Sequence, residues 1–232
     1  MSRSNPTSHE LVFSTVDGMA SASQFLGRSI ELAGNVAGYA LWRQARGFRP
    51  RRFLHRERLW RDALFPRLKG PVTVLEFGVA SGDATRFWLG ALRQPDLRWH
   101  GFDTFTGLPE GWRRGGIEYS AQGRFDTGGA PPDISDSRVS WHVGLVEDTL
   151  PKLELPPDGQ LCVLLDLDLY GPTAFALNWL ANRLQPGDIL YFDEIYDPWN
   201  ERRALDEFLD VGNRLTPIGS TGMSAAFAVA PS

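Results

Sequence analysis

The chain has 232 residues, a length that suits one α/β domain, and its 42% hydrophobic and 22% charged residues are typical of a globular protein. A formal net charge of -4 gives no overall reason to expect a nucleic-acid partner. Cys162 is the single cysteine, which excludes an internal disulfide and a cysteine zinc cluster and fits a reducing compartment. The chain shows no signal-peptide pattern and no uninterrupted apolar run of about 20 residues, so we expect a soluble, cytoplasmic protein.

Residues 1–70 are predicted to form a helical extension in front of the main domain. Apolar residues such as Leu26, Ile30 and Ala33 recur there at spacings of three and four. We expect this extension to supply a dimer contact, and hence a homodimer, and part of a lid over the active site.

A basic stretch, residues 42–69, carries ten Arg or Lys residues against two acidic ones. One interpretation is a face that follows the phosphates of RNA or DNA. The interpretation we favour is a solvated helix face, which also contacts a subunit or an acidic substrate. Binding to a nucleic acid with a steep salt dependence would support the first interpretation.

From residue 71 to residue 232, short apolar runs alternate with helical patterns. This alternation predicts a parallel sheet joined by crossover helices. The last two strands are separated only by the turn-rich GSTG, too short for a helix, and therefore predict an antiparallel hairpin at one edge of the sheet. The predicted strands are 72–77, 97–102, 139–143, 161–166 and 189–193, followed by the hairpin 214–218 and 224–229.

A long connection, residues 104–138, contains seven glycines and three prolines. A segment of this length with little regular patterning is usually disordered or functional. Aromatic residues are interleaved in it, Trp112 and Phe125 among them, and they favour a packed lid over a flexible linker.

The segment EFGVASG follows the first predicted strand and precedes a helical pattern. In parallel sheets, ligands bind at the carboxyl ends of the strands, where helix N-termini present free N–H groups. Gly78 and Gly82 allow the backbone to approach a ligand closely, and Ser81 offers a hydroxyl. Asp103 ends the second strand, where a carboxylate can accept both hydroxyls of a ribose, so we infer a nucleoside site. A tight turn without a ligand is the alternative.

The spacing of Glu76, Gly78 and Gly82 resembles the first motif of class I S-adenosylmethionine-dependent methyltransferases. The C-terminal hairpin, whose last strand inserts beside the fifth strand in that fold, is similar as well. The resemblance covers residues 70–230 and implies a Rossmann-like fold with a seven-stranded, mostly parallel sheet. The cofactor-binding residues it implies are Glu76, Gly78, Ser81, Gly82 and Asp103, with Glu147 and Asp148 near the adenine.

Two acidic doublets end the fourth and fifth strands, Asp166 with Asp168 and Asp193 with Glu194. These strands are neighbours in the predicted fold, so the carboxylates should lie close together and repel one another unless protons or a cation compensate. Magnesium takes oxygen ligands of this kind. In the alternative interpretation, Asp168 caps the following helix and Glu194 faces solvent.

Six segments together resemble the macrocin O-methyltransferase family, whose members methylate sugar hydroxyls of natural products: GFDTFTGLPEGW, GRFDTGGAPP, VGLVEDTLP, LDLDLYGPT, LQPGDILYFDE and RALDEF. The resemblance implies magnesium ligands at Asp166, Asp193 and Glu194, the last standing where the family often has Asp. It also implies a catalytic base at Asp168. The acceptor pocket is expected to include Trp112, Tyr170, Trp199 and Asn200.

The sequence thus predicts an enzyme that transfers a methyl group from S-adenosylmethionine, with Mg²⁺, to a sugar hydroxyl of a natural product or saccharide. Asp166 and Asp168 are its predicted catalytic residues, and neither a nucleic acid nor a membrane is an expected partner. N-methylation of an amino sugar is an alternative. A nicotinamide-dependent oxidoreductase is a second one, although Ala80 stands where the dinucleotide fingerprint has glycine.

Overall fold

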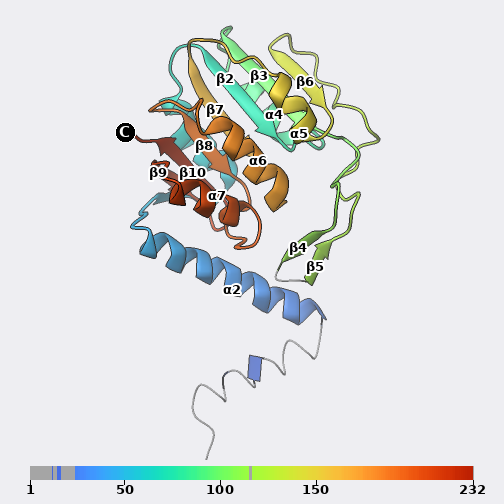
Figure 1. Ribbon diagram of the computed structural model, residues 1–232, viewed down its shortest axis with the longest axis vertical. Coiled ribbons are helices and arrows are strands. Elements are labelled where there is room, and N and C mark those ends of the chain that lie inside the picture. Colours follow the sequence, from blue (N-terminus) through green and yellow to red (C-terminus); the bar gives the residue numbers. More distant parts are fainter. Residues whose placement is uncertain (1–11, 13–14, 17–23, 115–116, 232) are drawn as a thin grey trace, which may run out of the picture.

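A computed structural model describes residues 12, 15–16, 24–114 and 117–231 (Figure 1). Its centre is an eight-stranded sheet with the order β1-β9-β10-β8-β7-β2-β3-β6. The strands are β1 (Arg51–Arg52), β2 (Val72–Phe77), β3 (Leu97–Asp103), β6 (Val139–Val143), β7 (Gln160–Leu165), β8 (Ile189–Phe192), β9 (Leu215–Ser220) and β10 (Ala225–Val229).

The strand arrangement confirms the predicted Rossmann-like class. Strands β6, β3, β2, β7 and β8 run parallel, and β10 lies antiparallel between β8 and β9. The sheet has one strand more than the seven expected, because Arg51 and Arg52 pair parallel with Gly219 and Ser220 of β9. A two-residue strand has no periodicity of its own, so the sequence did not predict β1. Because β1 lies outside β9, the edge of the sheet is β1 and not the hairpin, contrary to the prediction.

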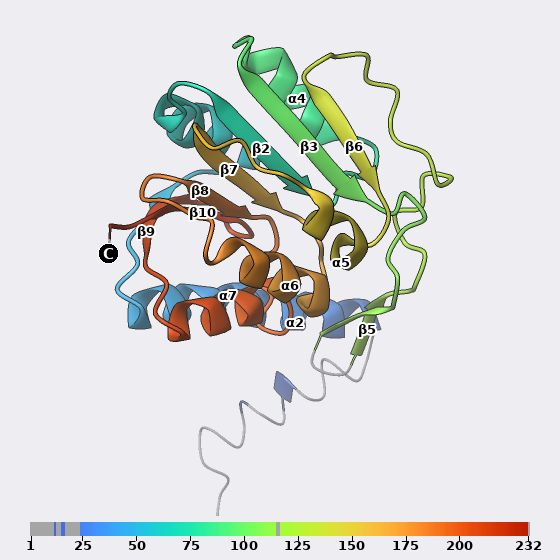
Figure 2. The same ribbon diagram turned by 45° about the horizontal axis from the view of Figure 1, so that its top comes forward.

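Helices cover both faces of the sheet, as Figure 2 shows. One face is covered by α2 (Gln24–Ala45), α5 (Val146–Thr149), α6 (Tyr170–Leu180) and α7 (Glu201–Asp210). On the other face lie α4 (Asp83–Ala91), α3 (Arg56–Leu59) and the π-helical turn η1 (Trp60–Leu64). All six residues of β2 are buried, because helices pack on both faces of this central parallel strand.

The described part of the N-terminal extension passes around the edge of the sheet formed by β1 and β9, from one face to the other. On one face, Trp42 Nε1 of α2 donates to Asp206 Oδ1 of α7 at 2.8 Å, and Arg46 forms ion pairs with Asp206 and Asp210. The chain then passes through β1 and buries Trp60 against the opposite face. Part of the basic stretch therefore serves internal packing. Residues 1–11, 13–14 and 17–23 of the predicted extension lie outside the described residues.

The connection 104–138 contains a small antiparallel hairpin of β4 (Trp112–Arg114) and β5 (Ile117–Ser120). Trp112 Nε1 and Arg114 Nε both donate to Asp197 Oδ2, at 3.3 and 3.1 Å. Asn200 Nδ2 donates to the carbonyl oxygen of Arg113 at 2.9 Å. The hairpin is thus fixed to the loop after β8, and in both views it lies near the N-terminal half of α2 (Figures 1 and 2).

Two expectations from the sequence concern the single cysteine and membrane-spanning helices. Cys162 is buried in β7 as a free thiol. None of the described helices combines the length and apolar character needed to cross a bilayer.

Candidate functional site

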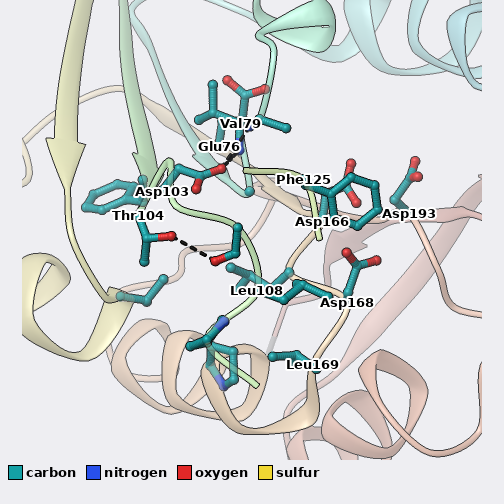
Figure 3. Close-up of a pocket in the computed structure, with 18 of the residues that line it drawn as sticks. Glu76, Val79, Asp103, Thr104, Leu108, Phe125, Asp166, Asp168, Leu169 and Asp193 are labelled. Atoms are coloured by element: carbon teal, nitrogen blue, oxygen red, sulfur yellow. Dashed lines mark hydrogen bonds between the residues drawn. The ribbon is translucent and has the colours of Figure 1, made fainter. Parts of the chain in front are cut away.

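A cavity of about 740 Å³ lies at the carboxyl ends of β2, β3, β7 and β8 (Figure 3). Its walls come from the β2–α4 turn, the ends of β3, β7 and β8, the loop before α5, the connection 104–138 and, from the N-terminal extension, Arg56. Figure 3 shows Glu76 and Asp103 toward one side and the carboxylates of Asp166, Asp168 and Asp193 toward the other. The cavity therefore joins the two motif regions that the sequence singled out separately.

Both glycines of the β2–α4 turn adopt left-handed backbone, with φ of +85° at Gly78 and +80° at Gly82. A Cβ atom on Gly78 would lie 1.8 Å from the carbonyl oxygen of Asp166, and one on Gly82 would lie 2.8 Å from Cγ of Pro132. Gly78 lines the cavity and Gly82 does not. Packing inside the protein therefore already requires glycine at both positions, because backbone crowds Gly78 and a side chain crowds Gly82. The sequence alone predicted only the close approach of a ligand.

The Asp103 carboxylate organises the turns around it. Its Oδ2 accepts hydrogen bonds from the backbone N–H groups of Val79 and Ala80, both at 2.8 Å, and its Oδ1 accepts one from Phe105 N at 2.7 Å. An ionised carboxylate has about four acceptor positions, so the side chain retains capacity for a ligand hydroxyl. Asp103 lines the cavity at the place expected for a ribose-binding residue.

Glu76 is a buried carboxylate in the cavity wall, with 1% of its surface exposed. Its Oε2 accepts hydrogen bonds from Thr85 Oγ1 and Trp99 Nε1, whereas Oε1 is buried without a partner among the described residues. Burial raises the pKa of this carboxyl to about 7. A buried acceptor without a donor is costly, so Oε1 is suited to a donor brought by a ligand.

The remaining predicted cofactor residues divide into two groups. Ser81 lines the cavity, as does Glu147 in the first turn of α5. Asp148 does not line it, and its backbone N–H donates to the carbonyl oxygen of Leu145 within the start of α5. Of the Glu147–Asp148 pair, Glu147 is the one in reach of a bound ligand.

The four carboxylates at the ends of β7 and β8 all line the cavity: Asp166, Asp168, Asp193 and Glu194. Asp168 is 7% exposed and adopts a φ of +61°. A non-glycine residue in this region is uncommon, and the strain is of the kind found at functional sites. The cap and solvent roles considered for Asp168 and Glu194 do not describe their positions.

Burial and mutual repulsion raise the pKa of three of these carboxyls, those of Asp166, Asp168 and Glu194. Burial, together with Glu194 and Asp193, raises the pKa of Asp168 to about 8. Burial and the nearby Asp193 likewise raise the pKa of Glu194 to about 7. The pKa of Asp166 is raised well above its usual range by burial and by the charges of Asp193 and Asp168.

Two arginines from distant segments reach into this acidic cluster. Arg56 Nη1 lies 3.2 Å from Asp193 Oδ2 and 3.8 Å from Asp166 Oδ2. Arg114 Nη2 lies 3.2 Å from Glu194 Oε2, and Arg114 Nε pairs with the fully buried Asp197 at 3.1 Å. Sequence reasoning missed all three of Arg56, Arg114 and Asp197. The signal available for Asp197 was its place in the motif YFDEIYDPWN, three residues beyond Glu194.

The chemistry of these side chains fits a hard divalent cation, because Mg²⁺ prefers oxygen ligands such as carboxylates. The carboxylates also outnumber the two arginines beside them. The present arrangement of the carboxylates fits less well. No three acidic, His or Cys side chains of the described part of the chain converge as a metal-binding group. Asp193 in particular has both oxygens occupied, Oδ1 by the Tyr191 hydroxyl and Oδ2 by Arg56.

Among the predicted acceptor residues, Trp112 lines the cavity, together with Phe125 of the predicted lid and with Leu108, which the sequence did not single out. Three others do not line it. Asn200 Oδ1 accepts from the backbone N–H of Tyr170 at 3.2 Å, while the Tyr170 hydroxyl donates to Glu207 Oε2 and its ring stacks with Arg203. Trp199 is 52% exposed outside the cavity lining.

Comparison with known proteins gives a family match and structural neighbours. The model of a methyltransferase domain family matches residues 75–195, just over half of the chain. The calicheamicin methyltransferase CalS11 has a similar structure, with a TM-score of 0.55 and 22% identity over 97% of this chain and 94% of that one. The O-methyltransferase NovP is similar with a TM-score of 0.53 and 23% identity, over 75% of this chain and 78% of that one. No curated protein sequence matches the chain.

The matched region begins in β2, includes Gly78 in the β2–α4 turn and Asp103 at the end of β3, and ends just beyond the second acidic doublet. It therefore contains both ends of the cavity and confirms the resemblance inferred from the motifs. The chain belongs to the methyltransferase domain family and is a class I S-adenosylmethionine-dependent methyltransferase.

Proposed function

We propose that this enzyme is an O-methyltransferase that methylates a sugar hydroxyl of a natural product or saccharide, with the help of Mg²⁺. The observation that carries the proposal is the single cavity that runs from Glu76 and Asp103 to the four carboxylates of β7 and β8. One end has the character of a nucleoside site and the other that of a site for a hydroxyl and a cation.

At the first end, Asp103 accepts the ribose hydroxyls, and the unpartnered Oε1 of Glu76 faces the positively charged amino group of the cofactor. Gly78 and Ser81 border the methionine part, and Glu147 lies beside the adenine. S-adenosylmethionine supplies a methyl group bonded to a positively charged sulfur. The protein's main contribution is to align this group with the acceptor oxygen, since positioning alone supplies roughly 7–11 kcal/mol in favourable cases.

At the second end, Asp168 takes the proton of the acceptor hydroxyl on a carboxylate oxygen. The acceptor oxygen then bonds to the methyl carbon as the carbon–sulfur bond breaks, and the electron pair of that bond stays on sulfur. The pKa of about 8 suits this role, because a base is most effective when its pKa lies near the working pH. The strained backbone and low exposure fix the Asp168 carboxylate in one place.

Asp166, Asp193 and Glu194 are the proposed ligands of Mg²⁺. Bound there, the ion supplies a positive charge that lowers the pKa of an acceptor hydroxyl and holds it in place. The surplus of carboxylates over the guanidinium groups of Arg56 and Arg114 supports the assignment.

The sugar acceptor is supported by the lid and by the neighbours. Trp112, with Leu108 and Phe125, gives the cavity an apolar wall beside the carboxylates, which suits the faces of a sugar ring. The CalS11 enzyme is described in a second structure as a TDP-rhamnose 3'-O-methyltransferase. Tyr170, Trp199 and Asn200, which do not line the cavity, remain proposed acceptor contacts. The homodimer and the cytoplasmic location also remain predictions.

Calorimetric titration with S-adenosylmethionine, with NADH in parallel, is the first test. We expect one S-adenosylmethionine site per chain, weakened roughly 10- to 100-fold by Asp103→Ala and unchanged by Asp96→Ala, an exposed residue of the same charge. Methyl transfer to glycosylated acceptors in the presence of Mg²⁺ is then assayed. Transfer only to amino sugars would support N-methylation instead, and a preference for NADH would contradict the proposed cofactor site.

A further inference from the structure

Among the described residues of the N-terminal extension, Arg56, the first residue of α3, lines the active-site cavity. It is separated by 137 residues from Asp193, to which its Nη1 donates at 3.2 Å. The same nitrogen lies 3.8 Å from Asp166 Oδ2. The guanidinium therefore bridges two carboxylates from neighbouring strands, both proposed as ligands of Mg²⁺.

The position of Arg56 is supported from behind. Its guanidinium carbon lies 5.2 Å from the centre of the Trp60 ring, and Trp60 is 2% exposed among Phe87, Trp88 and Tyr191. An arginine over an aromatic face gains a cation–π attraction. The ion pair is thus a built feature of the site, and the side chain keeps a resting place on Trp60 if it leaves the carboxylates.

The contacts of Asp193 make a second cation and Arg56 mutually exclusive there. Its Oδ1 accepts a hydrogen bond from the Tyr191 hydroxyl and its Oδ2 accepts one from Arg56, so a cation bound to Oδ2 would share that oxygen with the guanidinium. Magnesium binds carboxylate oxygens at about 2.0–2.1 Å, and at that distance from Asp193 Oδ2 it would stand against the guanidinium. Two positive groups so close repel each other strongly in a partly buried site.

We propose that Arg56 is the resident counterion of the acidic cluster, and that a divalent cation binds Asp166 and Asp193 only when the Arg56 side chain swings away. This inference rests on the proposed magnesium site. Arg56 is a positioning residue in this scheme. It neutralises the two carboxylates before the cation arrives and sets the affinity for it, so the N-terminal extension controls metal loading of the active site.

Calorimetric titration of the full-length protein with MgCl₂ and with MnCl₂ tests the proposal. We expect Arg56→Gln to bind either cation roughly tenfold more tightly than the unchanged protein, a size typical of coupling between two ligands. Arg58→Gln removes the same charge from the same helix without a contact to the cluster and should bind as the unchanged protein does. Adding Asp166→Asn to Arg56→Gln should abolish the binding.

Two other results would contradict different parts of the proposal. Equal affinity in the unchanged protein and Arg56→Gln, lost on Asp166→Asn, would overturn the role of Arg56 and leave the magnesium site intact. If no cation binds to either protein while S-adenosylmethionine still does, the magnesium site itself is wrong and the role of Arg56 falls with it.

A measurement on the unchanged protein removes any dependence on how well Arg56→Gln folds. Phenylglyoxal modifies accessible arginines, and peptide mass spectrometry reports the rate at each residue. Saturating Mg²⁺ should accelerate modification of Arg56 several-fold and leave Arg58 unaffected. A rate at Arg56 that does not change with Mg²⁺ would contradict the proposal even if the calorimetry supported it.

Discussion

The two ends of the cavity are built in opposite ways. Around Asp103, the polar partners are backbone N–H groups of adjacent turns, from Val79, Ala80 and Phe105. Around Asp193, the partners are side chains, and Arg56 comes from a segment 137 residues away. The cofactor end is therefore a rigid product of the fold, and the acidic end is an assembly of charges that binding of a cation or an acceptor can rearrange.

The pKa values of the carboxyl groups also differ between the two ends of the cavity. At the cofactor end, Glu76 is the carboxyl whose pKa is raised, to about 7, mainly by burial. At the acidic end, burial and like charges raise the pKa of Asp166, Asp168 and Glu194 together. Each ionised carboxylate makes the next harder to ionise, so the acidic end favours binding of a proton or a cation.

The largest effect is expected at the proposed base. Asp168→Asn keeps the shape of the side chain, and asparagine tolerates positive φ, so the fold and S-adenosylmethionine binding should persist. Loss of the base should lower kcat by about 10²- to 10⁴-fold. Initial rates of methyl transfer measure this. A kcat within a factor of a few of the unchanged enzyme would remove Asp168 from the mechanism.

The next largest effect is expected at Gly78, where the β2–α4 turn packs against the backbone of Asp166. Gly78→Ala places a Cβ against the carbonyl oxygen of Asp166 and strains a left-handed residue, so we expect a loss of about 3 kcal/mol in the free energy of unfolding. Gly90→Ala, in α4 with no atom within 4 Å of the added Cβ, should instead stabilise by about 0.5–1 kcal/mol. Urea denaturation compares them. Equal stabilities would mean that the β2–α4 turn is less rigid than its contacts indicate.

A smaller effect is expected where the lid meets the acidic end. Asp197 accepts from Trp112, Arg114 and Asn200, and Asp197→Asn weakens these bonds without changing size. We expect about 2 kcal/mol less stability and a higher KM for the acceptor, with the dissociation constant of S-adenosylmethionine unchanged. Thermal unfolding and steady-state kinetics check both. An equal rise in that dissociation constant would show that the two ends are not independent.

The smallest effect is a pH dependence at the cofactor end. The ionised form of Glu76 attracts the amino group of S-adenosylmethionine and the protonated form does not, so affinity should fall as the pH drops through about 7. The raised pKa also means that the folded protein holds this proton up to about pH 7, so its contribution to stability is lost as the pH rises through that value. Glu76→Gln should abolish the pH dependence of binding. Titrations between pH 6 and 8 that give parallel curves for both proteins would contradict this assignment.

The sequence was informative wherever structure is local. The strands 72–77 and 139–143 have the predicted bounds, because the first is a continuous run buried on both faces and the second alternates apolar with polar residues. The Glu76, Gly78 and Asp103 spacing identified one end of the cavity, because consecutive parallel strands bring their ends to the same edge. The two acidic doublets identified the other end for the same reason.

What the sequence alone determined is thus the Rossmann-like class, the methyltransferase motifs and the carboxylates at the strand ends. Only the tertiary structure decided that β1 adds to the sheet, that Arg56 pairs with Asp193, and that Arg114 pairs with Glu194 and Asp197. It also left Tyr170, Trp199 and Asn200 outside the cavity lining. The physical reason is distance along the chain: periodicity and motif spacing report contacts between near neighbours, whereas ion pairs between remote segments depend on how the finished layers pack.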